Sequence, residues 1–552
     1  MPDFAATHRA TLDGAIAAIR ARGHWSAYPE IPSGKVYGET AKVEGEAAFQ
    51  AMLNGHFETG QAAESWVGEE TSPFGPALGI TYPANTPGTL VARGGAAMPA
   101  WAAAPVEDRA GIALEALHRI NRASFLMANA VMHTTGQAFA MAFQAGGPHA
   151  QDRGLEAVAY AVEEISRIPG AARWSKPAGR ETLVMDKTWR AVPRGVAVTI
   201  GCATFPTWNG YPGIFASLVT GNPVIVKPHP KAILPLALSV RVLREVLAEA
   251  GLPADVVQLA PDTIEAPITA RLAKHPDVAI VDFTGGPTFG RWLRENLGPG
   301  KALFTEEAGV NPVVLHSTAD FAGLCRNLAF SLSLYSGQMC TAPQNIFVPS
   351  GGIQTDQGHR SFDEVGAAIA AAVDALLADP ARAAGILGAI QNPATVDRVA
   401  AARSLGQVVR NSAPVEGAPG RTATPLLLAV NAADRDAWME ERFGPIAFLI
   451  RCAEAEEALA LAAGSARERG AITALVHSTD EAFLDRATEA FTRVGASLSV
   501  NLTGGVYVNQ SAAFSDYHVS GANPAGNACL TDAAFVANRF HVAQVRRPAV
   551  AA

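Results

Sequence analysis

Cys340 stands in the segment with the strongest chemical signature, Ser336-Gly337-Gln338-Met339-Cys340-Thr341, just after an apolar helical run from Leu328 to Leu334. An isolated cysteine in apolar surroundings is usually an inert packing residue. In this segment the glycine permits a tight turn with exposed backbone N–H groups, and such groups lower the pKa of a thiol and hold an oxyanion. The pattern predicts a nucleophilic thiol at Cys340, with structural packing as the alternative.

Two adjacent carboxylates, Glu306 and Glu307, leave an apolar strand-like run, and Glu306 lies 34 residues before Cys340. A solvated acidic loop is the ordinary explanation of such a pair. Because successive side chains of an extended segment face opposite ways, one of the two would face the thiol and the other would face away. A carboxylate next to a nucleophile is suited to act as a general base.

Alternating strands and helices must position these residues. Continuous apolar runs alternate with segments of helical periodicity, as is typical of a parallel, doubly wound α/β sheet covered on both faces. Ligands bind at the carboxyl ends of such strands, which here carry Cys202, Lys227 and the Phe283–Gly286 segment. A second α/β region follows, with apolar strands NPVVL, QNIFV, IAFLI, ITALV and SLSVN up to about residue 500. The runs of the first region are 196–201, 223–227, 256–260 and 278–283.

The composition excludes several classes of protein. The 552 residues are too many for one ordinary core, and 49% hydrophobic with 17% charged residues is typical of a folded chain. A net charge of −8 without a basic block argues against nucleic acid as a partner. No run of about 18 apolar residues predicts a membrane span, and the N-terminus lacks a signal-peptide core. Five cysteines without a CxxC pair suit a reducing compartment, so we expect a cytoplasmic protein, and no His, Cys or Asp spacing predicts a metal site.

Five motifs, taken with their order and spacing, resemble those of the aldehyde dehydrogenase superfamily. EEAGVNP stands where the family has ELGGKNP, SGQMC resembles its nucleophile motif, and FTGG resembles its FTGS turn. GNPVIVKP resembles the family's GNTVVLKP strand, and the run from Glu441 to Pro445 resembles its ExFGP motif. The similarity extends from about Pro99 to the C-terminus.

The resemblance implies an aldehyde dehydrogenase-like α/β fold with a Rossmann-type doubly wound cofactor domain, an α/β catalytic domain and a strand-rich oligomerisation arm. Through this arm we expect a homodimer or homotetramer. The first 85 residues lack long apolar periodicity, so we expect an irregular extension wrapped over the surface. The expected domains are 1–85 for the extension, 86–182 and 194–305 for the cofactor domain, 306–505 for the catalytic domain, and 183–193 and 506–552 for the arm.

The resemblance also assigns catalytic roles. Cys340 would attack the aldehyde carbon to give a thiohemiacetal, hydride would pass to a nicotinamide, and Glu306 would activate the water that hydrolyses the resulting thioester. Thr204 stands where the family has the asparagine that holds the oxyanion, and the reach of its hydroxyl differs from that of an amide. Asn209, five residues further on, would compensate only if its loop folded back.

Cofactor contacts are assigned by the same resemblance. Lys227 would bond the adenosine ribose, the helix start after Gly286 would hold the pyrophosphate, and Glu441 would bond the nicotinamide ribose. The family often has a glutamate shortly after its Lys-Pro pair, whereas this chain has His229-Pro230, which leaves room for a 2′-phosphate. We therefore expect NADP in preference to NAD. The expected cofactor-binding residues are Lys227, Gly285, Gly286, Glu441, Phe443 and Phe205.

The N-terminal extension and the runs GHWSAYPEIPS and SVNLTGGVYVNQSAAFSD resemble the PaaN-type branch of phenylacetic acid degradation. That likeness implies oxidation of a small-molecule aldehyde, a ring-opened and CoA-linked semialdehyde, to a carboxylic acid. A CoA-acylating or general aromatic aldehyde dehydrogenase is the alternative, and Glu306 argues against the acylating type. A catalytically silent cofactor-binding scaffold is the alternative from another class. Changed motif positions at Thr204, Ala308 and Val310 favour it, while the intact Cys340, Glu306 and Glu441 oppose it.

Overall fold

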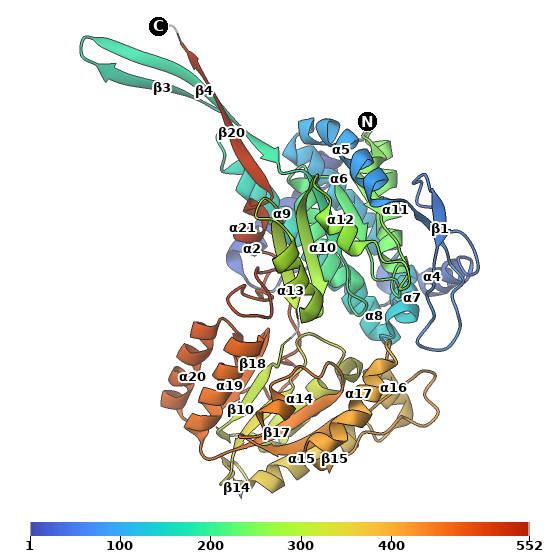
Figure 1. Ribbon diagram of the computed structural model, residues 1–552, viewed down its shortest axis with the longest axis vertical. Coiled ribbons are helices and arrows are strands. Elements are labelled where there is room, and N and C mark those ends of the chain that lie inside the picture. The colour runs from blue at the N-terminus through green and yellow to red at the C-terminus, as the bar shows by residue number, and fades with distance from the viewer. Residues whose placement is uncertain (1, 308, 550–552) are drawn as a thin grey trace.

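Two α/β units, one above the other in Figure 1, make up the body of the protein, and a long three-stranded sheet projects from the upper unit. This computed structural model describes residues 2–307 and 309–549. No helix in the described part of the chain is long and apolar enough to cross a membrane. The α/β architecture predicted from the sequence is confirmed.

A parallel sheet of five strands, in the order β7-β6-β5-β8-β9, forms the centre of the upper unit. The chain runs outward from β5 to β7 and returns through β8 to β9, so the strand order reverses between β5 and β8. In open α/β sheets a ligand crevice lies at this reversal, beyond the carboxyl ends of the strands. The strands are β5 (Val196–Ile200), β6 (Val224–Lys227), β7 (Val257–Leu259), β8 (Val278–Gly285) and β9 (Ala302–Glu307).

Helices cover both faces of this sheet, which explains why its strands are apolar throughout. One face packs with α10 and α11 in the largest hydrophobic core, and the other packs with α5, α12 and α13. Neighbouring residues of one strand, such as Ala197 and Val198, enter these two cores in turn. The helices are α5 (Pro87–Ala103), α10 (Pro206–Val219), α11 (Leu234–Glu249), α12 (Thr269–Lys274) and α13 (Pro287–Asn296), with a short turn η1 (Ala254–Val256) before β7.

A seven-stranded sheet, β15-β16-β17-β12-β10-β18-β19, forms the lower unit and is parallel except for its edge strand β15. It contains every strand predicted for the second region. The expected boundary at residue 306 differs from the structure, because β9 carries Glu306 and Glu307 within the upper sheet. The strands are β10 (Pro312–Leu315), β12 (Asn345–Pro349), β15 (Gln407–Arg410), β16 (Leu426–Asn431), β17 (Ile446–Cys452), β18 (Thr473–His477) and β19 (Ser497–Val500).

Helices and short turns surround the lower sheet, and a small sheet of β11 (Ser317–Thr318), β13 (Ile353–Thr355) and β14 (Gly358–Arg360) lies beside it. The helix α14 leads into the turn η2, which precedes Cys340. The helices and turns are α14 (Phe321–Ser333), η2 (Leu334–Gly337), α15 (Phe362–Leu376), α16 (Pro380–Leu387), α17 (Ala394–Ala402), η3 (Arg403–Leu405), α18 (Arg435–Trp438), α19 (Ala455–Arg469) and α20 (Glu481–Val494).

The projecting sheet has the order β20-β4-β3, with both pairs antiparallel (Figure 1). Its strands are β3 (Ala171–Ala178), β4 (Glu181–Pro193) and β20 (Phe540–Pro548), and α21 (Ala533–Ala537) lies just before β20. The projection therefore begins before residue 183, where the sequence placed the start of the arm, because β3 pairs along β4 instead of joining the cofactor domain. Residues 550–552 of the expected arm lie outside the described part of the chain.

The N-terminal 85 residues are more regular than the sequence predicted. Four helices and a two-stranded ribbon form there, and residues such as Leu12 and Ile19 join the largest core of the upper unit. The expectation of an irregular extension was wrong, because short amphipathic helices bury their apolar faces against α6 and α9. The elements are α1 (Phe4–Thr7), α2 (Arg9–Ala21), α3 (Gly34–Tyr37), α4 (Ala41–Gln50), β1 (Ser65–Val67) and β2 (Tyr82–Ala84), followed after α5 by α6 (Val106–Arg122), α7 (Ser124–Thr135), α8 (Phe139–Gly146) and α9 (Pro148–Ser166).

Candidate active site

A single cleft of about 1410 Å³ opens at the carboxyl ends of β5, β6 and β8 and extends to the loop that carries Cys340. This cleft is lined by all nine residues that the sequence assigned to catalysis or cofactor binding. The structure thus brings the expected residues together, while the role of each stays a prediction. They are Thr204, Phe205, Lys227, Gly285, Gly286, Glu306, Cys340, Glu441 and Phe443.

Cys340 follows a turn with an unusual backbone. Tyr335, Ser336 and Gly337 all have positive φ angles, of 53°, 51° and 64°. At Gly337 an added Cβ would lie 2.4 Å from the carbonyl oxygen of Gly444, so a larger residue would push the turn away. The tight turn expected from the SGQMC motif is therefore present, and it brings Cys340 to the wall of the cleft.

The Cys340 thiol lies against a carboxylate, with Sγ 3.4 Å from Oε1 of Glu306. Burial raises the pKa of Cys340 well above its usual value, and the negative charge of Glu306 raises it further. The sequence had suggested that backbone N–H groups would lower this pKa; in the resting protein the desolvation of the thiol outweighs any such effect. Cys340 therefore rests as a thiol whose proton points at Glu306.

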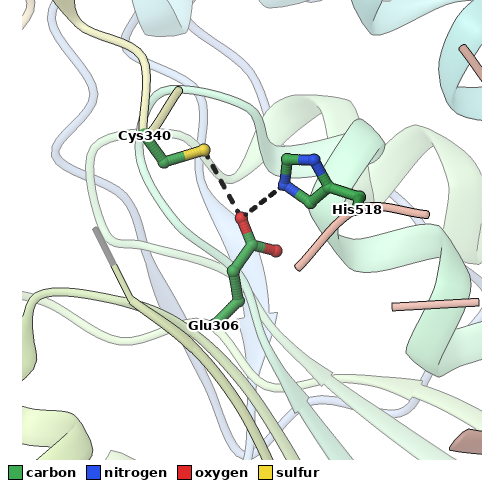
Figure 2. Close-up of side chains that lie close together, drawn as sticks. All are labelled: Glu306, Cys340 and His518. Atoms are coloured by element: carbon green, nitrogen blue, oxygen red, sulfur yellow. Dashed lines mark hydrogen bonds and ion pairs between the residues drawn. The ribbon is translucent and has the colours of Figure 1, made fainter. Parts of the chain in front are cut away.

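Glu306 lies on the last strand of the upper sheet and receives three contacts. Oε1 accepts from Cys340 Sγ and lies 3.0 Å from His518 Nε2, as Figure 2 shows. Oε2 accepts a hydrogen bond of 2.8 Å from Asn209 Nδ2. Glu307 pairs instead with Arg294 of α13, so the two carboxylates face opposite ways, as the extended backbone predicts.

Two of these contacts were not assigned by the sequence. His518 lies 212 residues from Glu306 in a loop, and no sequence motif marks it. Asn209 was considered only as a possible substitute, and it reaches the site because α10 begins at Pro206 and places Asn209 on its first turn. The thiol, carboxylate and imidazole are donor types that also bind Zn²⁺, and their donor atoms lie within 4.8 Å of one another. Hydrogen bonds among the three groups already account for this spacing.

Thr204 and Phe205 occupy the loop between β5 and α10. The Thr204 hydroxyl lies 4.0 Å from Cys202 Sγ, and its carbonyl accepts a hydrogen bond from Gln137 Nε2. Phe205 meets the ring of Tyr335 edge-on at 5.6 Å between centroids. The loop thus connects the end of β5 to the turn before Cys340, and the expected oxyanion role of Thr204 stays a prediction.

Lys227 lies at the end of β6 in the same cleft and is 2% exposed. Its Nζ donates to Asp262 Oδ1 at 2.6 Å and to the carbonyl of Pro228. Burial lowers the pKa of Lys227, and the charge of Asp262 acts in the opposite direction. The sequence did not predict this ion pair, which fixes the ammonium group at the wall of the cleft.

The start of α13 offers free backbone amides to the cleft. No side chain caps this helix, and its N-cap residue Gly286 has open space where a Cβ would stand. An uncapped helix start with an unobstructed glycine suits a pyrophosphate. Across the cleft lies Glu441, where burial raises the pKa to about 7, and Arg398 holds the neighbouring loop by donating to the carbonyl of Phe443. These residues fit a dinucleotide.

Comparisons with known proteins agree with this geometry. The model of the aldehyde dehydrogenase family matches residues 87–528. The crystal structure of an NAD-dependent aldehyde dehydrogenase from Burkholderia multivorans has a TM-score of 0.97 and 52% identity, with full coverage of both chains.

More distant relatives are also similar. N-succinylglutamate 5-semialdehyde dehydrogenases of Paraburkholderia xenovorans (strain LB400) and Burkholderia multivorans (strain ATCC 17616 / 249) are 29% and 30% identical. In both cases the match covers 66% of this chain and 71% of the relative. A 1-pyrroline-5-carboxylate dehydrogenase from Thermus shares the fold, with a TM-score of 0.74 at 20% identity over 95% of this chain and 99% of that one. The chain belongs to the aldehyde dehydrogenase family and is an oxidoreductase.

Proposed function

We propose that this enzyme oxidises an aldehyde to a carboxylic acid with NAD as the hydride acceptor. The observation that carries the proposal is the thiol of Cys340 at 3.4 Å from a buried carboxylate, Glu306, in a cleft that fits a dinucleotide. A thiol with a base in contact is suited to form a covalent intermediate and then to release it by hydrolysis.

Each residue of the pair has a defined task in this reaction. The Cys340 sulfur forms a bond to the aldehyde carbon as its proton moves to Glu306, and the carbonyl electron pair moves onto oxygen. A nicotinamide held in the cleft would supply the hydride acceptor, and loss of hydride from that carbon would leave Cys340 bonded to the acyl group as a thioester. Glu306, once it has released its proton, removes a proton from water, and the attack of this water breaks the C–S bond. The free acid is released, and the proton that Glu306 took from water passes to the sulfur, which restores the thiol of Cys340.

Charges around the adenosine end of the cleft support NAD, although the sequence had favoured NADP. Lys227 is paired with Asp262 at 2.6 Å, and Lys231 is paired with Glu69 of the N-terminal segment at 3.1 Å. Burial, followed by the charges of both lysines, lowers the pKa of His229 to about 4, so its imidazole is neutral at pH 7. Neither the paired lysines nor His229 therefore offers a spare positive charge for a 2′-phosphate. The NAD-dependent relative with 52% identity supports the same choice.

The substrate is proposed to be a semialdehyde, which carries a polar group at its far end. The names of the N-succinylglutamate 5-semialdehyde dehydrogenases support this class, and the sequence motifs support the ring-opened, CoA-linked semialdehyde of phenylacetate degradation as one member. The contact between Glu306 and Cys340 supports hydrolysis over transfer to coenzyme A, because a base is in place for water.

A homodimer or homotetramer built through the β20-β4-β3 sheet is also proposed. Leu183, Val542 and Val545 on this projection are 49%, 52% and 52% exposed, and a partner would cover them. Light scattering on the full chain, and on a variant with polar residues at these three positions, would test the proposal. A variant of unchanged mass in solution would contradict it.

The activity is tested by reduction of NAD and NADP in the presence of aliphatic, aromatic and CoA-linked semialdehydes. We expect NAD reduction by the wild type, a free acid as the product, and no reduction by Cys340→Ala, which should still bind NAD. The matched control is Cys325→Ala, which removes a buried cysteine of the lower unit that does not line the cleft. Cofactor binding without turnover of any aldehyde would contradict the proposal and favour the silent scaffold.

A further inference from the structure

His518 reaches the carboxylate of Glu306 from a part of the chain that holds none of the expected site residues. It lies in the loop between β19 and α21, and its side chain is 3% exposed. Its Nε2 lies 3.0 Å from the same oxygen, Oε1, that Cys340 Sγ approaches to 3.4 Å. Figure 2 shows the resulting row of thiol, carboxylate and imidazole, with the carboxylate in the middle.

The backbone fixes this imidazole firmly. Val519, the next residue, is buried and has a φ of 62°, a left-handed conformation that β-branched residues rarely adopt. Such strain persists only where surrounding contacts impose it, and it clusters at functional sites. The carbonyl of His518 accepts a hydrogen bond from Leu530 N at 3.1 Å, and the Trp208 ring meets the imidazole edge-on at 4.7 Å between centroids. These contacts hold the His518 ring next to Glu306.

Negative charge near Cys340 opposes ionisation of its thiol, and His518 contacts the carboxylate that carries part of this charge. Burial raises the pKa of Cys340, and the charges of Glu306, Cys202 and Glu441 raise it further. Two hydrogen bonds draw charge away from the Glu306 carboxylate: one from Asn209 to Oε2 and one from His518 to Oε1.

Arg153, a charged residue near His518, already interacts with other side chains. On α9, Arg153 stacks over the Trp208 ring at 5.0 Å and pairs with Glu156 at 2.9 Å. Among the hydrogen bonds of the described residues, none joins a lysine or arginine to Cys340 or Glu306. The imidazole of His518 therefore contacts the same Glu306 oxygen, Oε1, that Cys340 Sγ approaches.

We infer that His518 is a positioning residue whose imidazole holds Glu306 against Cys340, where Glu306 can accept the thiol proton and later act on water. Its hydrogen bond also draws from the carboxylate part of the negative charge that opposes ionisation of the thiol. The inference rests on the proposed roles of Cys340 and Glu306. In the first step the S–H proton moves to Oε1 while sulfur bonds to the aldehyde carbon. Before hydrolysis Glu306 releases this proton; the carboxylate then takes a proton from water as the water oxygen bonds to the thioester carbon, and the C–S bond breaks with return of that proton to the sulfur of Cys340. Without His518 the carboxylate would turn from the thiol, and both steps would slow.

The experiment compares His518→Gln, which keeps an N–H donor, with His518→Leu, which is similar in size but has none. Alkylation of Cys340 by iodoacetamide is followed from pH 6 to pH 10, and mass spectrometry separates Cys340 from the other four cysteines. We expect alkylation at pH 7 to be about tenfold slower in His518→Leu, with its midpoint moved to higher pH, and to recover in His518→Gln. His316→Gln is the control, because His316 stacks on Phe483 in the lower unit, away from the cleft.

Kinetics provide the second readout. We expect kcat to fall by about 10²-fold in His518→Leu, with little change in the KM for NAD, and a burst of NADH before a slow steady state because hydrolysis is limiting. If His518→Leu fails to fold, His518→Ala takes its place in both assays. Alkylation profiles and kcat that match the wild type in the folded donor-free variant would overturn the inference. Alkylation requires neither NAD nor aldehyde, so it remains decisive for His518 even if the wild type reduces no cofactor.

Discussion

Asp262→Asn is expected to destabilise the upper unit strongly, because it removes the charge that balances a buried ammonium group. Lys227 and Asp262 are each 2% exposed, and Nζ lies 2.6 Å from Oδ1. At an effective dielectric constant of about 20, two unit charges at this separation attract by about 6 kcal/mol. Loss of one partner of a buried pair costs about 3–5 kcal/mol, and we expect the lower end of this range because asparagine keeps an acceptor oxygen.

The cost should depend on pH in a defined direction. Burial already lowers the pKa of Lys227, and Asp262 is the group that raises it, so the variant lowers this pKa further. A lysine with a depressed pKa in the folded protein is protonated more readily in the unfolded chain. Stability is therefore lost as the pH falls from the unfolded value of 10.5 to the lowered folded pKa, and it is recovered as the pH rises again towards 10.5. The deficit of Asp262→Asn should be largest at pH 7 and shrink by pH 9.5.

Urea denaturation followed by tryptophan fluorescence, at pH 7.0, 8.5 and 9.5, measures this deficit. The matched control is Asp255→Asn, because Asp255 is 38% exposed and pairs with Arg244 at 3.0 Å. A pair with an exposed member contributes about 0–1 kcal/mol, so the control should change the free energy of unfolding little. A deficit no larger than that of the control, or one that grows with pH, would refute the reasoning.

Three further predictions concern the cleft and its support. Because burial raises the pKa of Glu441 to about 7, the KM for NAD should rise as the pH falls below 7, and Glu441→Gln should flatten this dependence in initial-rate measurements. Asn209→Ala should lower kcat by about 10²–10³-fold, because Asn209 donates a hydrogen bond of 2.8 Å to Glu306. Thr204→Val should lower kcat by less, because the Thr204 hydroxyl lies near Cys202 and not near Glu306. Equal losses of kcat in the two variants would argue against this order. Arg539→Ala should cost about 3–5 kcal/mol in urea denaturation, because Arg539 is 0% exposed and bonds Asp282 through two nitrogens; a loss below 1 kcal/mol would contradict it.

The strands that position the site could be predicted because their apolar runs are continuous. A strand buried on both faces has no polar alternation, and flanking glycines and prolines mark its ends, as at Val196–Ile200 and Val224–Lys227. The N-terminal helices were missed for the opposite reason. In Arg9–Ala21 the buried face consists of Leu12, Ala15, Ala18 and Ile19, and the two alanines weaken the apolar periodicity. Tertiary contact with α9 stabilises such a helix more than its own sequence does.

The candidate site was predictable where a motif is local and unpredictable where it depends on distant contacts. Cys340, Glu306 and Lys227 each stand in a short motif next to a strand or a turn, so the sequence indicated them. Asp262 and His518 meet their partners across 35 and 212 residues, and no nearby pattern distinguishes them from ordinary polar loop residues. Their importance follows from desolvation, because a buried lysine or carboxylate needs a partner wherever the chain can supply one.

The residues of the site come from three separate segments, so a change in one segment can displace residues of another. Cys340 comes from a loop of the lower unit, Glu306 from the edge strand of the upper sheet, and His518 from the C-terminal loop. That loop is attached along β9, where Glu307 N donates to Ala525 O at 2.6 Å and Asn527 N donates to Thr305 O at 3.1 Å. A change in the C-terminal loop therefore displaces the strand that carries the base and the imidazole that holds it. Such damage should therefore slow both attack by the Cys340 thiol and thioester hydrolysis, and change cofactor binding less.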